Sequence, residues 1–142
     1  MAKVTIKSAK KRAWKVFSEY IRRKYSKNGM CTCVTCGCVK PWREMQAGHA
    51  MAGRYNSILY CEKIVRPQCF FCNCRKGGAP DEYHKWLLDE YGQDGYDELL
   101  LLKHGKDKDG NDLNIKFTID ELEKMIEGWQ KEIKNIGERA KI

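Results

Sequence analysis

The chain has 142 residues, a length usual for one domain. Its 27 Lys and Arg exceed its 19 Asp and Glu, for a formal net charge of +8, and 42% of the residues are hydrophobic. This composition is typical of a globular protein, and the apolar runs are too short to cross a bilayer. The first residues lack the apolar core of a secretion signal, so we expect a cytoplasmic protein without membrane contact. Eight cysteines in a reducing compartment favour metal binding over disulfides.

Charge divides the sequence into three blocks. Residues 1–28 carry +9, residues 29–80 carry +5 and residues 81–142 carry −6. We interpret them as a basic N-terminal helix, a zinc-knuckle module and a helical C-terminal region that packs on the same domain. A basic block of this kind suits a polyanion such as nucleic acid, although a solvated helix face would look the same.

The first predicted element is an amphipathic helix over residues 8–26, capped by Ser8. Apolar and aromatic side chains recur along it at spacings of three and four residues, which favours a core-facing stripe over a platform for stacking bases. The stripe consists of Ala13, Phe17, Tyr20, Ile21 and Tyr25. Basic side chains lie mostly off the stripe and are left for phosphates.

Short elements are predicted for the middle of the chain. Residues 32–39 look like a knuckle, residues 43–49 like a strand and residues 57–61 like another short apolar piece. A short helix is expected to begin near Cys69 and to end near Gly77.

The C-terminal region is predicted to be helical. A helix over residues 81–104 is expected to begin at Asp81 and to break at Gly92 and Gly95. The sequence from Thr118 to Glu121 is a capping box, which predicts the start of a last amphipathic helix. That helix could pack on its own domain, the interpretation that we favour, or form a homodimer interface.

Two CxxC pairs are the strongest chemical signal. Cys33 with Cys36 and Cys69 with Cys72 have the spacing that places four thiolates around one tetrahedral zinc ion. A redox motif would need a βαβ context that is missing, and buried free thiols are the remaining alternative. Because Cys31 and Cys38 flank the first knuckle symmetrically, the choice of ligands there stays open. A second zinc site is disfavoured, since the other cysteines lack ligand spacing: Cys31, Cys38, Cys61 and Cys74.

A histidine lies between the knuckles and an asparagine follows the second one, in Gln46-Ala47-Gly48-His49 and Cys69-Phe70-Phe71-Cys72-Asn73. In this arrangement the sequence resembles the HNH, or ββα-metal, endonucleases. It is most similar to the NinG/Rap recombination nuclease family of lambdoid phages. Further matching residues are Trp14, Phe17-Ser18, Tyr20-Ile21-Arg22, Gly37, Met45, Gln68, Gly77-Gly78, Tyr83 and Leu87.

The resemblance implies an α+β fold, with a small zinc-stabilised ββα-metal (HNH-like) module flanked by the N-terminal basic helix and C-terminal helices. It implies a divalent-metal-dependent DNA endonuclease in phage recombination, active in the host bacterial cytoplasm on Holliday junctions or other DNA with branches or single strands. His49 would be the general base, since a neutral imidazole can take a proton from water near pH 7. Asn73 would offer an oxygen to Mg²⁺ or Mn²⁺, while zinc would be structural.

Candidate DNA contacts are the basic side chains of the first two blocks. They are Lys10, Lys11, Lys15, Arg22, Arg23, Arg54, Arg66, Arg75 and Lys76.

Two positions depart from the HNH pattern. Many HNH enzymes carry a second metal ligand immediately before the catalytic histidine, where this chain has Gly48. The middle asparagine of the pattern falls near Ile64 and is absent. Other side chains would then have to complete the ion's shell, with Glu44, Gln46 and His84 as candidates.

Two other classes of function stay open. One is a non-catalytic zinc-binding module that binds DNA, which the departures at residues 48 and 64 favour. The other is a zinc-stabilised adaptor that binds proteins through its acidic C-terminal helices.

Overall fold

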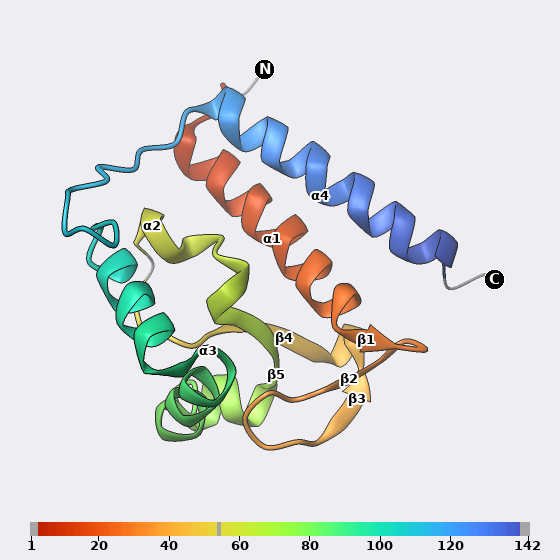
Figure 1. The fold of residues 1–142 in the computed structure, drawn as a ribbon. Helices are drawn as coiled ribbons and strands as arrows, with labels where there is room; N and C mark the ends of the chain where they lie inside the picture. Colours follow the sequence, from red (N-terminus) through yellow and green to blue (C-terminus); the bar gives the residue numbers. More distant parts are fainter. Residues whose placement is uncertain (1–2, 54, 140–142) are drawn as a thin grey trace.

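The computed structural model describes residues 3–53 and 55–139. Two long helices lie side by side along one edge of a mixed α+β domain, short strands occupy its middle, and a third, interrupted helix lies on the other side (Figure 1). In chain order the elements are α1 (Ile6–Lys24), β1 (Ser26–Lys27), β2 (Met30–Thr32), β3 (Val39–Pro41), η1 (Trp42–Glu44), β4 (Met45–His49), α2 (Asn56–Leu59), η2 (Glu62–Ile64), β5 (Val65–Cys69), η3 (Phe71–Arg75), α3 (Pro80–Lys103) and α4 (Ile119–Arg139).

Helix α1 begins earlier than predicted because Thr5, not Ser8, caps it. The Thr5 side chain accepts from the backbone N–H of Ser8, and the Ser8 hydroxyl accepts from the backbone N–H of Thr5, both at 3.1 Å. The expected cap residue is therefore the third helical residue of a reciprocal capping box. The predicted stripe is confirmed in its core-facing role, since Ala13, Phe17 and Ile21 are buried.

Helices α1 and α4 run parallel to each other, although the rest of the chain separates them in sequence (Figure 1). The small residues Ala9 and Ala13 of α1 pack against Leu122 and Ile126 of α4. Further along, the rings of Phe17 and Trp129 approach to 4.9 Å between centroids. The apolar face of α4 is thus covered by its own domain.

The strands form two small antiparallel sheets. Strands β1, β2 and β3 make one, and β4 pairs with β5 in the other, from Met45 opposite Cys69 to His49 opposite Val65. The strand predicted over residues 43–49 is present from residue 45, because η1 takes up residues 42–44 as a single turn. The apolar piece predicted over residues 57–61 contains the short helix α2.

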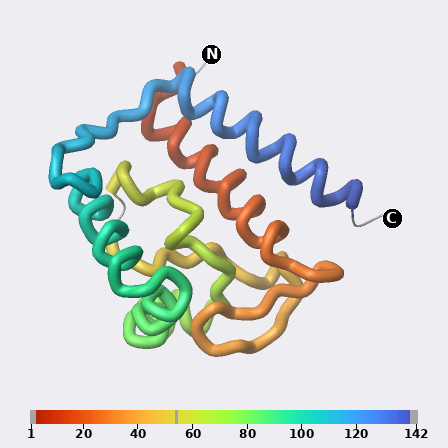
Figure 2. The backbone as a smooth tube through the Cα atoms, viewed as in Figure 1, coloured from red at the N-terminus to blue at the C-terminus, as the bar shows by residue number. Residues whose placement is uncertain are grey.

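The C-terminal helices show the predicted interruption and the predicted cap, with one difference. Helix α3 is interrupted at Gly92, whose φ of 73° and ψ of 175° are not helical, whereas Gly95 stays within the helix. The capping box before α4 is confirmed, because the backbone N–H of Glu121 donates to the Thr118 hydroxyl at 3.1 Å. The tube in Figure 2 shows the connection between α3 and α4 returning to the start of α1.

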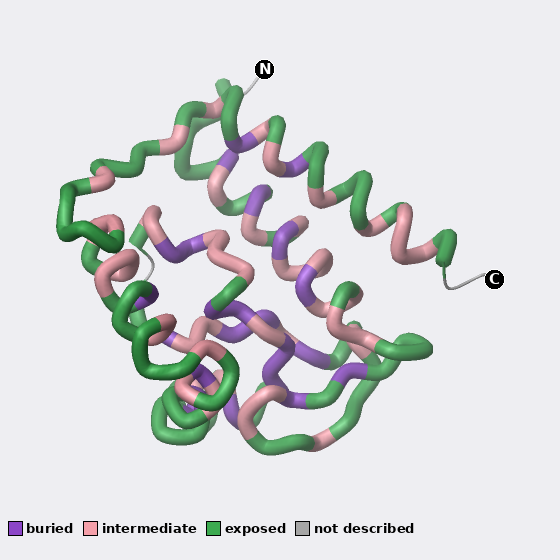
Figure 3. Tube along the Cα trace, in the orientation of Figure 1, coloured by how far each residue is buried: buried purple, intermediate pink, exposed green. Residues whose placement is uncertain are grey.

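Buried residues concentrate where α1 crosses the β4–β5 pair, as Figure 3 shows. The centre of this core contains Phe17, Ile21, Ile58, Ile64, Val65 and Leu87. Hydrophobic burial of this kind fixes α1 over the strand that carries His49. Within the described ranges, no helix combines the length and apolar character needed to cross a bilayer.

Candidate functional site: a cysteine cluster beside a basic pocket

Four cysteine sulfurs, those of Cys33, Cys36, Cys38 and Cys69, lie within 4.8 Å of one another. A tetrahedral zinc ion with Zn–S bonds of about 2.3 Å separates its sulfur ligands by about 3.8 Å. The Sγ atoms of Cys36 and Cys69 are 3.8 Å apart. The donor set therefore fits a tetrahedral, thiophilic ion such as zinc.

Backbone hydrogen bonds shape the first knuckle. The N–H of Cys33 donates to the carbonyl of Cys38 at 2.8 Å, and the N–H of Gly37 donates to the carbonyl of Cys33 at 2.9 Å. Gly37 has a φ of 80°, which a glycine adopts without strain. This turn brings Cys38 back beside Cys33. The second knuckle joins it at the end of β5, where the N–H of Cys69 donates to Sγ of Cys33 at 3.3 Å.

The structure differs from the predicted ligand set at one position. Cys38, not the predicted Cys72, completes the group of four sulfurs. Cys72 is buried nearby, and its thiol interacts with those of Cys36 and Cys69. The cluster therefore contains five neighbouring thiols. Cys38 joins them because of the turn at Gly37. The CxxC spacing does not predict this turn.

The thiols of the cluster differ in acidity. Burial raises the pKa of Cys33, but hydrogen bonds from the Thr35 hydroxyl and from backbone N–H groups outweigh burial and lower that pKa to about 6. Burial, together with contacts to the thiols of Cys36 and Cys69, raises the pKa of Cys38 to about 12. Since a thiolate is the ligand form, the hydrogen bonds that lower the pKa of Cys33 also favour its ligand form.

The other three cysteines lie apart from the four-sulfur group. Cys31 is buried and its thiol donates to the carbonyl of Arg22 at 2.9 Å, so it ties β2 to α1. Cys61 is half-buried, and Cys74 is exposed with its thiol 3.3 Å from Oε1 of Gln46. Among the described residues, Cys33, Cys36, Cys38 and Cys69 are the one group of His, Cys, Asp or Glu side chains close enough together to hold a metal ion.

A pocket of about 540 Å³ opens beside the cluster and contains both predicted catalytic residues, His49 and Asn73. Residues from α1, from β4 and from two glycine-containing segments surround it. Besides His49 and Asn73, it is lined by Trp14, Ser18, Arg22, Met45, Gln46, Ala47, Met51, Ala52, Gly53, Gly77 and Gly78. The fold thus brings the histidine and the asparagine to one cavity, as their placement around the knuckles predicted.

The imidazole of His49 is held from two sides. Its Nε2 lies 3.0 Å from the carbonyl oxygen of Leu59, and its ring stacks on the indole of Trp14 with centroids 4.9 Å apart and planes 15° apart. A carbonyl can only accept a hydrogen bond, so Nε2 carries the proton of the neutral ring. The lone pair of the neutral imidazole is then on Nδ1.

The amide of Asn73 is oriented by a neighbouring side chain. Its Nδ2 donates to Oε1 of Gln46 at 2.6 Å. This contact assigns the other amide atom, Oδ1, as the acceptor. Of the three side chains expected to complete an ion's shell, Gln46 lines the pocket. His84 meets the ring of Tyr96 of α3 edge to face, and Glu44 is not among the lining residues.

Gly48 packs against Gln68, which occupies the space that a side chain at residue 48 would need. An ideal Cβ on Gly48 would lie 2.0 Å from Oε1 of Gln68. Gln68 is fully buried, and its Nε2 donates to the carbonyl of Gly78 at 2.8 Å and to the Thr35 hydroxyl at 3.1 Å. These bonds fix the amide so that Oε1 points at Gly48. Packing alone therefore excludes a metal-ligating side chain at residue 48.

The basic face of α1 leads into the pocket. Trp14, Ser18 and Arg22 line both the pocket and a groove along α1 that also contains Lys11 and Lys15. Lys10 donates to Asn56 at 2.7 Å. Three of the predicted DNA contacts, Lys11, Lys15 and Arg22, thus lie along one track.

Three guanidinium groups surround Trp42 near the same end of α1. Those of Arg22, Arg23 and Arg43 lie 5.3, 5.0 and 4.8 Å from the centre of the indole. Cation–π contacts of this kind hold the three cations close together despite their repulsion. The predicted contacts Arg22 and Arg23 are therefore part of a concentrated positive patch.

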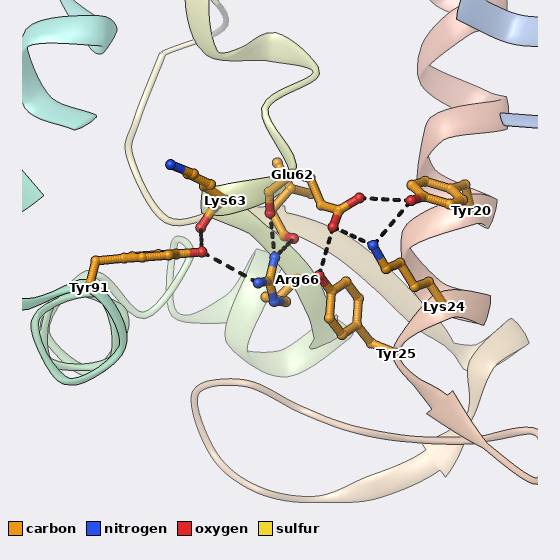
Figure 4. A network of polar contacts seen from close by, with 8 residues as sticks. Tyr20, Lys24, Tyr25, Glu62, Lys63, Arg66 and Tyr91 are labelled. Carbon is orange, nitrogen blue, oxygen red and sulfur yellow. Dashed lines mark hydrogen bonds and ion pairs between the residues drawn. The ribbon is translucent and has the colours of Figure 1, made fainter. Parts of the chain in front are cut away.

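Arg66, another predicted phosphate contact, is instead committed to the interior of the fold (Figure 4). Its guanidinium donates to the carbonyls of Glu62 and Val65, and it lies 4.2 Å from the ring centre of Tyr25 and 5.1 Å from that of Trp86. A phosphate would have to displace these partners. The role of Arg66 as a DNA contact stays a prediction, and its guanidinium already has these partners within the fold.

Of the remaining predicted DNA contacts, two are exposed on the surface and one lies outside the described residues. Arg75 and Lys76 are exposed on η3 and just after it, and Lys76 lies over the ring of Phe71 and within 3.7 Å of Glu82. Arg54 lies outside the described residues.

Sequence reasoning missed the roles of Trp14, Gln46 and Gln68 in shaping the site. Their contacts with His49, Asn73 and Gly48 join residues that are distant in sequence. The pairing of Gln46 with Gln68 across β4 and β5 is the one signal that could have placed both beside the site, once the strand register was known.

Fold and site together define a mixed α+β domain with a cysteine cluster that can hold a metal ion. Residues 2–139 match the family model described as Bacteriophage Lambda NinG protein, and the chain belongs to this NinG family. The resemblance to that family is thereby confirmed. Comparisons with curated proteins and with solved structures give no match.

Proposed function

We propose that the protein is a metal-dependent DNA endonuclease of the HNH type that acts on branched DNA, such as Holliday junctions, in phage recombination. One observation carries the proposal: His49 and Asn73 line a single pocket between the basic helix α1 and the cysteine cluster. Strands β4 and β5 with η3 would form the ββα-metal module, and zinc in the cluster would clamp it.

His49 is the general base in this proposal. The carbonyl of Leu59 and the indole of Trp14 hold the imidazole with its lone pair on Nδ1. A water molecule in the pocket gives a proton to the neutral imidazole and attacks the phosphorus of the scissile phosphate, the bond from phosphorus to the 3′-oxygen breaks, and the leaving oxygen takes a proton from water. The protonated imidazole keeps its Nε2–H bond to Leu59, so the ring need not move during the step.

Asn73 holds the divalent ion through Oδ1, an oxygen ligand that suits Mg²⁺ or Mn²⁺. Such an ion supplies charge neutralisation at the phosphate and at the leaving 3′-oxygen. Gln46 keeps the amide in the required orientation by accepting from Nδ2 at 2.6 Å. Since a side chain at residue 48 would overlap Gln68, water and phosphate oxygens would have to supply the other ligands, as Mg²⁺ commonly allows.

The basic groove of α1 binds the DNA backbone without reading sequence. Lys11 and Lys15 line the groove, and Arg22 lines both the groove and the pocket, where it can bind the scissile phosphate. The positive patch around Trp42 extends this surface.

Cleavage assays on plasmid, Y-shaped and four-way DNA, with and without Mg²⁺ or Mn²⁺, test the proposal. We expect metal-dependent cleavage that falls by about 100-fold or more in His49→Ala, because a general base commonly contributes that much. His84→Ala is the matched control, since His84 does not line the pocket and contacts Tyr96 edge to face. Cleavage that is equal in both variants would contradict the role of His49.

A non-catalytic, zinc-binding DNA-binding module is the second candidate. The observation that favours it is the absence of a ligating side chain at residue 48. Salt-sensitive DNA binding without cleavage in any metal would support this module and refute the nuclease.

Cutting both strands of a junction calls for two active sites, so we further propose that the protein acts as a homodimer. Because α1 covers the apolar face of α4, the interface would have to use another surface. Sedimentation equilibrium with and without four-way DNA measures the oligomeric state. A monomer under both conditions would contradict the homodimer.

A further inference from the structure

The cysteine cluster contains one thiol more than a tetrahedral ion can bind. Cys33, Cys36, Cys38 and Cys69 form the group of four sulfurs, and the thiol of Cys72 adjoins those of Cys36 and Cys69. The thiol of Cys38 adjoins the same two sulfurs. Cys36 and Cys69, whose sulfurs are 3.8 Å apart, therefore have two further thiols as neighbours.

The two competing thiols come from different parts of the fold. Cys38 belongs to the first knuckle and immediately precedes β3. Cys72 belongs to η3, where its N–H donates to Sγ of Cys69 at 3.4 Å and where Asn73 is the next residue. Cys33, Cys36 and Cys69 are common to both sets of four, so only the fourth ligand differs.

We propose that Cys38 and Cys72 are interchangeable fourth ligands of a single metal ion that Cys33, Cys36 and Cys69 hold permanently. This inference rests on the zinc site of the proposed function and not on nuclease activity. With Cys38 bound, the ion joins the first knuckle to β5 alone. With Cys72 bound, the ion also fastens η3, the element that presents Asn73 to the pocket.

Metal binding by single and double variants tests the exchange. Cys38→Ser and Cys72→Ser each retain four thiols, so each is expected to keep one equivalent of zinc with an affinity within about tenfold of the parent chain. The double variant keeps three, and its affinity is expected to fall by at least about 100-fold. Chelator competition measures the affinity, and cobalt substitution reports the number of thiolate ligands by its charge-transfer absorption.

Cys74→Ser is the matched control, because Cys74 shares η3 with Cys72 but lies outside the four-sulfur group. The proposal is overturned if one single variant loses as much affinity as the double variant, since that residue would then be a fixed ligand. It is also overturned if the double variant binds zinc like the parent chain.

A measurement on the unsubstituted, zinc-loaded protein avoids any folding defect in the variants. The ¹³Cβ chemical shift of a cysteine differs between its zinc-bound and free forms. Exchange predicts intermediate or doubled shifts for both Cys38 and Cys72. One bound shift and one free shift would refute it. Cleavage assays run in parallel distinguish failure of this proposal from failure of the proposed function. A protein that binds zinc but cuts no DNA would refute the nuclease function, and the zinc-binding test would still apply.

Discussion

The helical layer and the cysteine region of this protein are held together by different means. In the layer of α1 and α4, apolar side chains such as Phe17, Leu122 and Ile126 are almost fully buried. In the cysteine region, the helices and strands have five residues or fewer. They surround a small core that consists of cysteines together with Met45 and Ala79. Hydrophobic burial stabilises the first region, whereas the second has a much smaller core and a cysteine cluster that could hold a metal ion.

Each of the two regions positions one of the proposed catalytic residues. His49 is held by α1 through Trp14, on the side of the hydrophobic layer. Asn73 is carried by η3, on the side of the cysteines. The proposed active site therefore needs both kinds of stability at once, and changes on either side should have separable effects.

The largest expected effect is loss of the metal site. Cys36→Ser or Cys69→Ser removes a sulfur that both possible sets of four ligands share, so neither set can be completed. Zinc should be lost, with a cost of several kcal/mol because binding of structural zinc is folding free energy. Zinc content and thermal unfolding measure it. Cys74→Ser should keep both at the parent values. Full zinc content with a native melting profile in Cys36→Ser would refute the proposed site.

The counterpart in the helical layer is Phe17→Ala. Removing this buried ring, which contacts Trp129 and Tyr60, should lower the free energy of unfolding by about 3–5 kcal/mol. Val4→Ala, at a residue that is 47% exposed, is the control and should change stability by less than about 0.5 kcal/mol. Denaturant unfolding measures both. If zinc affinity fell as much as stability in Phe17→Ala, the two regions would not be separable.

A third change probes the junction of the two regions. Gly48→Ala should destabilise the fold by about 1–3 kcal/mol, because the new methyl group overlaps Oε1 of Gln68. Gln68→Ala removes the obstacle, so the double variant should be more stable than the sum of the single effects predicts. A double-mutant cycle in denaturant measures this coupling. Simple additivity would show that Gln68 is not what keeps residue 48 a glycine.

The smallest expected effect concerns the network of Figure 4. The Glu62 carboxylate accepts from Lys24 at 2.6 Å and from the hydroxyls of Tyr20 and Tyr25. Burial raises the pKa of Glu62, but these hydrogen bonds outweigh burial and lower it below its ordinary value. Because the folded pKa is the lower one, the stabilisation is fully present above the unfolded pKa of about 4.3 and is lost as pH falls through the folded pKa.

Glu62→Gln should therefore cost about 1 kcal/mol at pH 7, a modest value because the pair with Lys24 is partly exposed. The difference from the parent chain should shrink below about pH 4. Urea unfolding at several pH values measures it. A cost that stayed constant down to pH 2 would mean that the carboxylate charge does not matter.

Local sequence signals predicted the elements whose determinants are local. The capping box at Thr118 and the spacing of Phe17 and Ile21 gave α4 and the core face of α1. The positions of His49 and Asn73 around the knuckles predicted a common site, and the pocket unites them.

Two features of the site have long-range causes. The guanidinium of Arg66 contacts Tyr25, which follows α1, and Tyr91 of α3, and these two residues lie on opposite sides of β5 in the chain. Cys38 has no ligand spacing of its own and joins the cluster through the turn at Gly37. In both cases the deciding contact depends on tertiary structure, which spacing and periodicity do not encode.

The parallel pairing of α1 and α4 also bears on how the molecule is made. A ribosome produces α1 early, and the helix that covers its apolar face only after the whole middle of the chain. Until α4 emerges, Phe17 lacks its partner Trp129, and the helix that carries Trp14 is incompletely anchored over His49. On the proposed function, a nascent chain would therefore be unable to damage DNA, and the cutting site would mature only when synthesis reaches α4.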